Sequence, residues 1–178
     1  MSNMNNKENK NLIIIKYDGT DEAIKIRYLF LKSSNIDINI IFNSYKIKCK
    51  LNGIETIPRN NLSEYDYFLL ISRNDIVQNN SLFGTYYILN NGVPMTEIKI
   101  KQENKRTAEI RLETVEKYQR KGYATIGLQM AEQLIFASED IDTIHLNDVS
   151  EGKITTLIAI KNGYNTSNGY DFYKNKKR

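Results

Sequence analysis

The sequence predicts an α+β fold in which a mostly antiparallel central sheet is flanked by helices. Two observations carry this prediction. Between residues 85 and 115, three strand-like segments follow one another across short polar turns, which is typical of an antiparallel meander. After residue 122 the spacing of apolar residues becomes helical, and helices and strands then alternate. Because strand–helix–strand crossovers pair strands in parallel, one joint of the sheet is expected to be parallel.

The first eighty residues carry a weaker pattern. We expect a strand over residues 12–17 and a helix over residues 20–32, with Thr20 as its N-cap and acidic residues in its first turn. The next segments alternate apolar and polar residues or form short apolar runs, which is a strand-like pattern, and their order in a sheet is not assigned. These segments are residues 36–40, 45–49 and 67–71.

In the second half each element has a clear signal. We expect strands over residues 85–89 and 95–100, joined by a hairpin turn at residues 90–92, since Asn and Gly tolerate positive φ. The remaining expected elements are a polar turn at 103–106, a strand at 107–115, a helix at 122–137, a strand at 143–149, a helix that Ser150 caps and Gly163 ends, and a strand at 170–173.

Composition excludes several kinds of chemistry. The chain has 178 residues, which is about one domain, so we expect a single domain over 1–178 with a disordered segment at 1–11 and a basic tail at 174–178. The single cysteine, Cys49, excludes an intramolecular disulfide framework. With only one histidine, His145, a zinc site built from Cys and His is also excluded, and no metal is expected.

The net charge and the length of the apolar runs limit which classes of partner are expected. The net charge of +4 is mild, and no basic stripe is interleaved with aromatic residues, so nucleic acid is not an expected partner. The longest apolar runs, residues 12–15 and 134–137, are far below the roughly 20 residues that span a bilayer. The first eleven residues are polar and do not resemble a leader peptide. We therefore expect a cytoplasmic protein that does not interact with membranes.

The most informative segment joins a strand to a helix at residues 118–125. Gly122 lies at the junction, next to Arg120 and Lys121. The first N–H groups of a helix have no intrahelical partner and carry a positive partial charge, which suits a phosphate or pyrophosphate. A glycine lets such a ligand approach the backbone closely. The alternative is an ordinary strand-to-helix turn with solvated basic residues.

This turn resembles a motif of the GNAT N-acyltransferases. The family motif is Q/R-x-x-G-x-G/A, and the chain has Gln119-Arg120-Lys121-Gly122-Tyr123-Ala124. The hairpin before it is similar to that of the family, and Lys161-Asn162-Gly163-Tyr164 resembles the K-x-G-F ending of the family's fourth helix. The resemblance covers residues 85–173, about half of the chain. It implies a GNAT-like sheet whose strands 4 and 5 are parallel and splayed.

The resemblance also implies an activity and a co-substrate. The chain would move an acetyl group from acetyl-CoA directly to a primary amine of a small molecule or a protein, in an acyl-CoA-binding core at residues 85–173. The cofactor-binding residues that it implies lie on a strand edge and in the turn that follows. They are Thr114, Val115, Gln119, Arg120, Lys121, Gly122, Tyr123, Ala124 and Thr125.

Direct transfer requires a base for the attacking amine, whose pKa in an alkyl ammonium group is near ~10. Glu109 and Glu113, on the strand before the turn, are the candidate catalytic bases. The alternative is that they belong to an exposed charged face with cross-strand pairs. His145 is a further candidate, although a lone histidine on a strand is more often structural.

The leaving thiolate requires a hydrogen-bond donor, and here the sequence departs from the family. Ala159 occupies the position of the tyrosine that many members carry, and Gly152 that of an asparagine. Thr155 is the catalytic candidate, because the ribosomal-protein N-acetyltransferase subgroup often carries a serine there and a hydroxyl can donate to sulfur. These departures motivate a second hypothesis, a CoA-binding module that acts as a sensor or scaffold without catalysis.

The acceptor and the oligomeric state are left open, a homodimer included. Several tyrosines could line an acceptor groove or be plain strand residues. They are Tyr65, Tyr67, Tyr86 and Tyr87.

Overall fold

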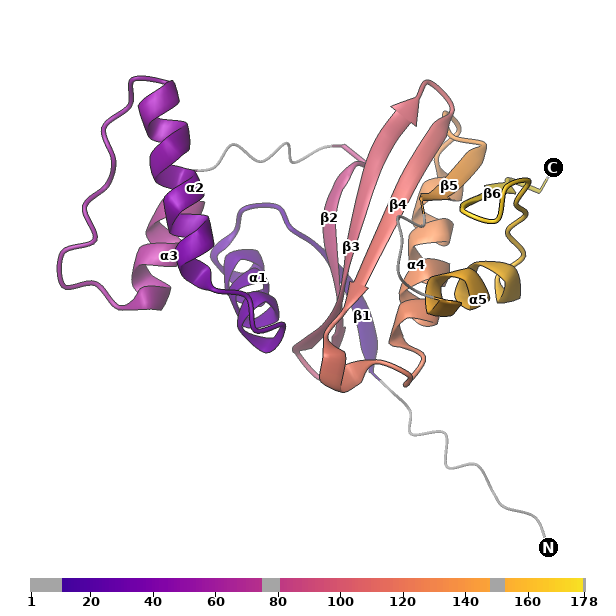
Figure 1. The fold of residues 1–178 in the computed structure, drawn as a ribbon, viewed down its shortest axis with the longest axis horizontal. Helices are drawn as coiled ribbons and strands as arrows, with labels where there is room; N and C mark the ends of the chain where they lie inside the picture. Colours follow the sequence, from indigo (N-terminus) through magenta and orange to yellow (C-terminus); the bar gives the residue numbers. More distant parts are fainter. Residues whose placement is uncertain (1–10, 75–80, 148–152, 178) are drawn as a thin grey trace, which may run out of the picture.

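The computed structural model describes residues 11–74, 81–147 and 153–177, which form an open six-stranded sheet with helices on both faces (Figure 1). Strand order follows the sequence, and every neighbouring pair is antiparallel except β4 and β5. The predicted fold class and its single parallel joint are therefore confirmed. The elements are β1 (Leu12–Lys16), α1 (Asp21–Ser33), α2 (Ile38–Leu51), α3 (Glu64–Ser72), β2 (Gly84–Asn90), β3 (Val93–Asn104), β4 (Thr107–Thr114), the 3-10 helix η1 (Glu116–Tyr118), α4 (Tyr123–Ala137), β5 (Thr143–Asn147), α5 (Lys153–Lys161) and β6 (Asp171–Asn175).

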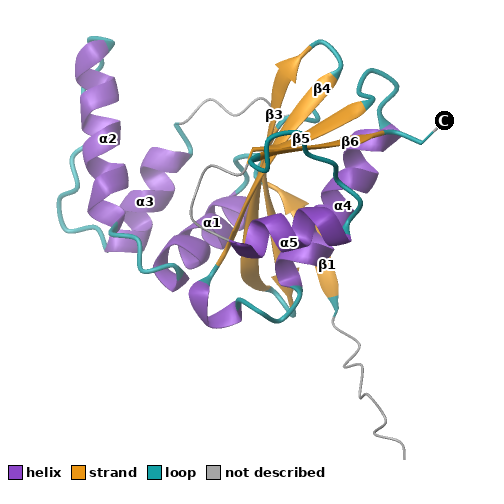
Figure 2. Ribbon diagram, turned by 45° about the vertical axis from the view of Figure 1, so that its right-hand side comes forward, coloured by secondary structure: helices purple, strands orange, loops and turns teal. Residues whose placement is uncertain are grey.

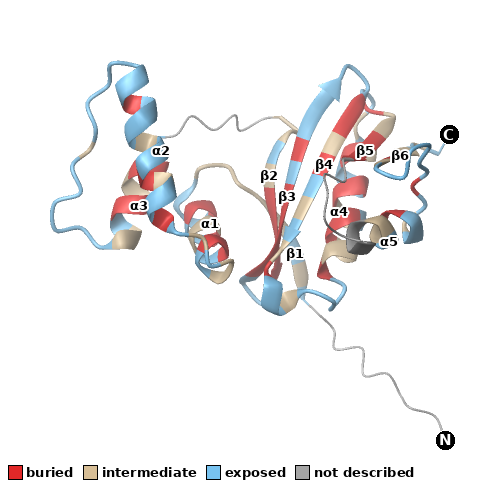
Figure 3. Cartoon of the chain, in the orientation of Figure 1, coloured by how far each residue is buried: buried red, intermediate tan, exposed pale blue. Residues whose placement is uncertain are grey.

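Two layers of helices enclose the sheet. Helices α4 and α5 cover one face, and α1 lies on the other face with α2 and α3 beyond it (Figures 1 and 2). The main core lies under α4, where Ile98 and Ile110 of the sheet meet Leu128 and Ile135 of the helix. These four side chains are buried to 99% or more, and buried residues mark the strands and the inner side of α4 in Figure 3. Burial of such aliphatic side chains supplies most of the stability of the fold.

A smaller core holds α1 against the opposite face of the sheet. Ile26 and Phe30 of α1 pack on Tyr87 and Leu89 of β2 and on Val115, which follows β4. A third cluster joins α2 and α3 to α1, with the rings of Phe42 and Tyr67 at a centroid distance of 4.7 Å. The end of β4 is thus fixed by the packing of Val115.

The structure corrects the strand-like pattern predicted for residues 36–40, 45–49 and 67–71, because α2 covers residues 38–51 and α3 covers residues 64–72. Helix α2 buries Ile38, Phe42 and Cys49, which recur at helical spacing. Helix α3 is an apolar run that is buried around Phe68. A short apolar run of this kind cannot be assigned to strand or helix by periodicity alone.

Other boundaries agree with the expectations or shift slightly. Thr20 caps α1 as predicted, accepting a hydrogen bond from the N–H of Ala23. Strand β3 runs on to Asn104, so the polar turn is shorter than residues 103–106. Gly163 ends α5 as predicted: its φ is +80°, and the N–H of Tyr164 bonds the carbonyl of Ala159 at 3.0 Å, as in a Schellman motif.

Some predicted features lie outside the described residues. They are the segment 1–10, the end of the expected strand at residues 148–149, and the cap at Ser150. Within the described part of the chain, none of the helices is long and apolar enough to cross a bilayer.

Gly127 sets how closely α4 approaches the sheet. A Cβ at this position would lie 3.1 Å from Cγ1 of Ile88 and 3.3 Å from Cδ1 of Ile98. Both contacts are tighter than an ordinary van der Waals contact, so a larger side chain would push the helix away from the main core.

We expect Gly127→Leu to lower the free energy of unfolding by about 1–3 kcal/mol, because overpacking forces the helix and the sheet apart. The measurement is urea denaturation. Gln133→Leu, on the exposed side of the same helix, is the matched control and should change stability by less than about 0.5 kcal/mol. Equal stability of the two variants would contradict the close contact at Gly127.

Candidate functional site

The sheet opens between β4 and β5. Strand β4 pairs with β3 along its whole length, but it pairs with β5 only from Thr107 to Ile110. In the part of the chain that the structure describes, no strand pairs with the β4 edge beyond Ile110. A groove of about 1190 Å³ lies along this edge, lined by residues of β3, β4, the turn after β4, the start of α4 and the last turns of α5.

The groove reaches both faces of the sheet. Leu112 faces the α4 side and packs against the main core, whereas its neighbour Glu113 points to the opposite side because side chains alternate along a strand. Ala124 and Ile158 line the groove on the α4 side, and Ser34, at the end of α1, lines it on the other. A ligand bound on one face can therefore meet a second ligand that enters from the other.

The start of α4 is the candidate anion site. Gly122 is its N-cap residue and supplies no side-chain hydrogen bond. By contrast, side chains of Thr20, Asp37 and Ser63 cap the starts of α1, α2 and α3. The first turn of α4, which faces the groove, therefore keeps its positive partial charge without a side-chain acceptor from its N-cap.

The backbone of the turn is shaped for close approach. Arg120 and Gly122 both have left-handed backbone angles, with φ of 60° and 84°. A Cβ on Gly122 would meet no atom within 4 Å, so it would project into open space. A side-chain hydrogen bond fixes the turn: Nε2 of Gln119 donates to the carbonyl of Thr114 at 3.2 Å. The motif glutamine thus ties the turn to the end of β4.

The structure brings the expected CoA-binding residues together. All but one of them line the groove: Thr114, Val115, Gln119, Arg120, Gly122, Tyr123, Ala124 and Thr125. The exception is Lys121, whose Nζ lies 5.8 Å from the centre of the Tyr118 ring. These residues fit an elongated anionic co-substrate, since they join a helix start, two basic residues and a strand edge with which no described strand pairs.

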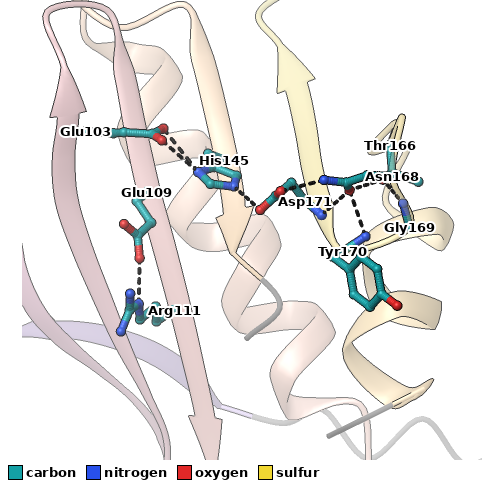
Figure 4. A network of polar contacts seen from close by, with 9 residues as sticks. All are labelled: Glu103, Glu109, Arg111, His145, Thr166, Asn168, Gly169, Tyr170 and Asp171. Carbon is teal, nitrogen blue, oxygen red and sulfur yellow. Dashed lines mark hydrogen bonds and ion pairs between the residues drawn. The ribbon is translucent and has the colours of Figure 1, made fainter. Parts of the chain in front are cut away.

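The expected catalytic residues differ in their position relative to the groove. Glu113 is exposed and lines the groove. Glu109 is not among the lining residues, and its Oε1 lies 2.5 Å from Nε of Arg111 (Figure 4). The side chain of Thr155 and the whole of Gly152 lie outside the described residues. Ala159 is fully buried in the main core, while its neighbours Ile158 and Lys161 reach the groove.

Glu97 is a groove residue that the sequence did not reveal. It lies on β3 directly opposite Glu113, and only 7% of the residue is exposed. The hydroxyl of Tyr87 donates to its Oε2 at 2.9 Å, and Nζ of Lys99 lies 2.8 Å from its Oε1. Burial raises the pKa of Tyr87 far above its usual value, so this hydroxyl stays protonated and holds the carboxylate in place.

A bulge explains why Glu97 was missed. The register of β3 and β4 shifts between Gln102 and Asn104, next to the hairpin turn. A shift of one residue decides which side chains share a face, and the local pattern of β3 contains no signal for it. The alternation of Glu97, Lys99 and Lys101 with buried isoleucines was the available clue that the carboxylate shares a face with these lysines.

His145 lies apart from the groove. Its Nδ1 lies 3.1 Å from both oxygens of Glu103, and its Nε2 lies 3.2 Å from Oδ1 of Asp171 (Figure 4). Its ring stacks on that of Tyr173. A hydrogen bond from Asn168 and then the contact with His145 lower the pKa of Asp171. The ring is 95% buried in this network, which supports the structural role rather than a role as a base.

The four tyrosines considered for the acceptor groove do not line it. Tyr65 and Tyr67 lie on α3, not on a strand, and Tyr86 and Tyr87 are buried in the sheet. Tyr118, in η1, is the tyrosine that lines the groove beside Tyr123. In the described part of the chain, no group of three or more His, Cys, Asp or Glu side chains is arranged to hold a metal ion.

The arrangement was compared with known proteins. No protein-family model matches the chain, and no curated protein matches it. Among solved structures, the acetyltransferase of the GNAT family from Streptococcus pneumoniae has a TM-score of 0.58 at 14% identity, over 93% of this chain and 99% of that one. The PaiA N-acetyltransferase from Thermoplasma acidophilum, solved in complex with coenzyme A, has a TM-score of 0.55 at 18% identity, with the same two coverages.

The fold is that of the GNAT acetyltransferases. A third GNAT-like neighbour is a spermidine N-acetyltransferase chimera from Vibrio cholerae and hSSAT, with a TM-score of 0.50 at 16% identity over 62% of this chain and 77% of that one. At these identities the likeness shows the fold alone.

We expect Gly122→Val to weaken CoA binding about tenfold or more, which is ~1.4 kcal/mol, because a side chain would then occupy the approach to the start of α4. Calorimetric titration with CoA is the measurement. Gly53→Val is the matched control, since Gly53 also has a positive φ and open space around it, but it lies outside the groove. Both variants should lose about 1–2 kcal/mol of stability from left-handed strain. Equal CoA affinity in the two variants would contradict the assignment.

Proposed function

We propose that this protein is an acetyl-CoA-dependent N-acetyltransferase that acts on a primary amine. The observation that carries the proposal is the groove itself. It begins at a helix start whose N-cap residue makes no side-chain hydrogen bond and runs along the edge of β4 beyond its last pair with β5. It ends at the carboxylates of Glu97 and Glu113 on the other face of the sheet. The GNAT fold supports this proposal, because one neighbour with this fold, the PaiA N-acetyltransferase, was solved in complex with coenzyme A.

In this proposal the turn and the β4 edge bind acetyl-CoA. Backbone N–H groups from Gly122 to Thr125 hold the pyrophosphate, and Arg120 and Lys121 add positive charge beside it. The β4 edge at Thr114 and Val115 pairs with the amide groups of the pantetheine arm, as an added strand would. The thioester then lies in the opening between β4 and β5, within reach of both faces.

The carboxylates prepare the acceptor. Directly opposite residues on paired strands lie about 5 Å apart, so Glu97 and Glu113 together attract an ammonium group. One carboxylate, directly or through water, takes a proton from this group, and the neutral amine attacks the thioester carbonyl. A C–N bond forms and the C–S bond breaks. The nitrogen loses a second proton as the amide forms, and the departing CoA thiolate takes up one proton to leave as the thiol. Glu113 and Glu97 are the proposed bases, and Glu109 is a further candidate that Arg111 holds outside the groove lining.

The donor to the thiolate is proposed to be Thr155, on the first turn of α5. This role rests on the position of Thr155 relative to the Lys161–Tyr164 block in the sequence. Because Ala159 is buried and has no hydroxyl, the usual tyrosine has no counterpart at that position. Stabilisation of the thiolate by hydrogen bonding is sufficient for a leaving group whose conjugate thiol has a pKa near ~8.5.

The second candidate function is a CoA-binding module without catalysis, and the observation that favours it is this missing tyrosine hydroxyl at Ala159. The two candidate functions differ in whether the protein turns over acetyl-CoA in the presence of an amine. The test is steady-state release of free CoA from acetyl-CoA with a panel of amines that includes spermidine, a lysine peptide and an aminoglycoside. Release with one class supports the acetyltransferase. CoA binding without release with any amine favours the binding module.

We expect Glu97→Gln and Glu113→Gln each to lower kcat/KM, with the larger loss, about 100-fold or more, in the variant that removes the base. The same variant should lose the acidic limb of the pH–rate profile. Gln keeps the shape of Glu97 and can still accept the hydrogen bond from Tyr87, so the fold is preserved. Glu139→Gln, on the exposed loop after α4, is the matched control. Unchanged kinetics in both test variants would overturn the assignment of the base and leave the transferase activity standing.

A further inference from the structure

The acceptor side of the groove carries a second charged feature, next to the carboxylates. On the β3–β4 ribbon, charged side chains on one face form three cross-strand rows, while Ile98 and Ile100 are buried on the other face. The rows are Glu97 opposite Glu113, Lys99 opposite Arg111, and Lys101 opposite Glu109. Two carboxylates therefore lie at one end of the ribbon face, and a pair of cations lies in the next row.

The spacing between these rows is set by strand geometry. Residues two apart on a strand share a face and are about 7 Å apart along it, at ~3.4 Å per residue. Lys99, Lys101 and Arg111 all line the same groove as Glu97 and Glu113. The backbones of the two rows are thus about 7 Å apart, while Nζ of Lys99 reaches back to 2.8 Å from Oε1 of Glu97. A ligand whose ammonium group takes the place of Lys99 at the carboxylates can meet the freed cation in the next row.

The cations are able to exchange partners. The side chain of Lys99 is 48% exposed and pairs with Glu97, and that of Arg111 is 49% exposed and pairs with Glu109. The carboxylates of these pairs are largely buried, since 9% of the Glu97 side chain and 16% of the Glu109 side chain are exposed. Lys99 can therefore leave Glu97 at small cost when the ammonium group of the acceptor takes its place. Lys101 is exposed and makes no ion pair with another residue in the described part of the chain.

We infer that the acceptor is an amine that also carries an anionic group, a carboxylate or a phosphate, about 7 Å from the nitrogen that is acetylated. The inference rests on the proposed function and names its acceptor class. The ammonium group binds at Glu97 and Glu113, and the anion binds at Lys99 and Arg111, with Lys101 adjacent. A polyamine is disfavoured, because its second ammonium group would lie against these cations.

The test compares acceptors of equal chain length that differ in one end group. They are 6-aminohexanoate, 6-aminohexyl phosphate, hexylamine and 1,6-diaminohexane. At low salt, kcat/KM for at least one of the two anionic acceptors should exceed that of hexylamine about tenfold or more, since hydrogen bonds to charged groups are the stronger ones. The diamine should be the poorest. The better anionic acceptor identifies carboxylate or phosphate. A preference for the diamine, or equal rates for all four, would overturn the inference.

A double variant locates the selectivity. Lys99→Met with Arg111→Met should reduce the ratio of kcat/KM between the better anionic acceptor and hexylamine to about twofold or less, because the anion then loses its partners. Lys105→Met, at the exposed tip of the same hairpin and outside the groove, is the matched control and should keep the full ratio. A ratio that survives in the double variant would place the anion elsewhere and contradict the inference.

Binding is measured separately from turnover, by calorimetric titration of the four compounds into the protein saturated with CoA. Tighter binding of an anionic acceptor than of hexylamine and the diamine, lost in the double variant, supports the inference even without catalysis. Equal or reversed affinities contradict it. Absence of CoA release with every amine counts only against the proposed transferase, so the two failures are distinguishable.

Discussion

The short parallel ladder between β4 and β5 is the constraint on which the rest of the site depends. Among the described residues, the two strands share the pairs from Thr107–Thr143 to Ile110–Leu146, whereas β4 continues for four more residues beside β3. Packing of Val115 under α1 fixes the far end of β4, so the strand cannot follow β5. The opening that results joins the two faces of the sheet. It also places the start of α4 at one end of the groove and the acidic row of β3 and β4 at the other.

This arrangement accounts for the shortage of reactive side chains in the sequence. The cysteine is buried in the α2 helix and the histidine is buried between two carboxylates, so neither is presented to the groove. The proposed transfer, in which the acceptor amine is the nucleophile and acetyl-CoA brings the activated group, needs neither. What the chain supplies is a helix start, a strand edge and carboxylates, all of which are positioned by backbone geometry and by the packing of neighbouring elements.

Local signals in the sequence predicted much of the second half. The meander, α4 and the end of α5 were predicted because turn residues and apolar periodicity specify them over short distances. Gly122, which the sequence places at the strand-to-helix junction, has a left-handed φ in the structure. Helix α2 was not recognised, because exposed Ile40 and Ile47 add apolar positions to a helix whose buried face is Ile38, Phe42 and Cys49. The apolar residues of α2 therefore do not all lie on one side of the helix, and in the sequence they alternate with polar residues as in a strand.

The part of the site that the sequence could not reveal depends on contacts between distant segments. Glu97 faces Glu113 only because a bulge near the hairpin turn sets the register, and its orientation depends on Tyr87, ten residues earlier on another strand. The different environments of Glu109 and Glu113 likewise follow from which one lies beside the opening. From the sequence, Glu109 and Glu113 were equivalent candidates for the base. The tertiary structure distinguishes them, because Glu113 lines the groove and Glu109 does not.

The most direct test of the central claim is an NMR titration of the ¹⁵N-labelled protein with acetyl-CoA, followed through the backbone amide resonances. The account predicts the largest shifts at the amides from Gly122 to Thr125, with a second group along the end of β4, and smaller shifts at the same turn with inorganic pyrophosphate alone. Saturable binding that leaves the amides of this turn unmoved, or no binding of acetyl-CoA at all, would contradict the account.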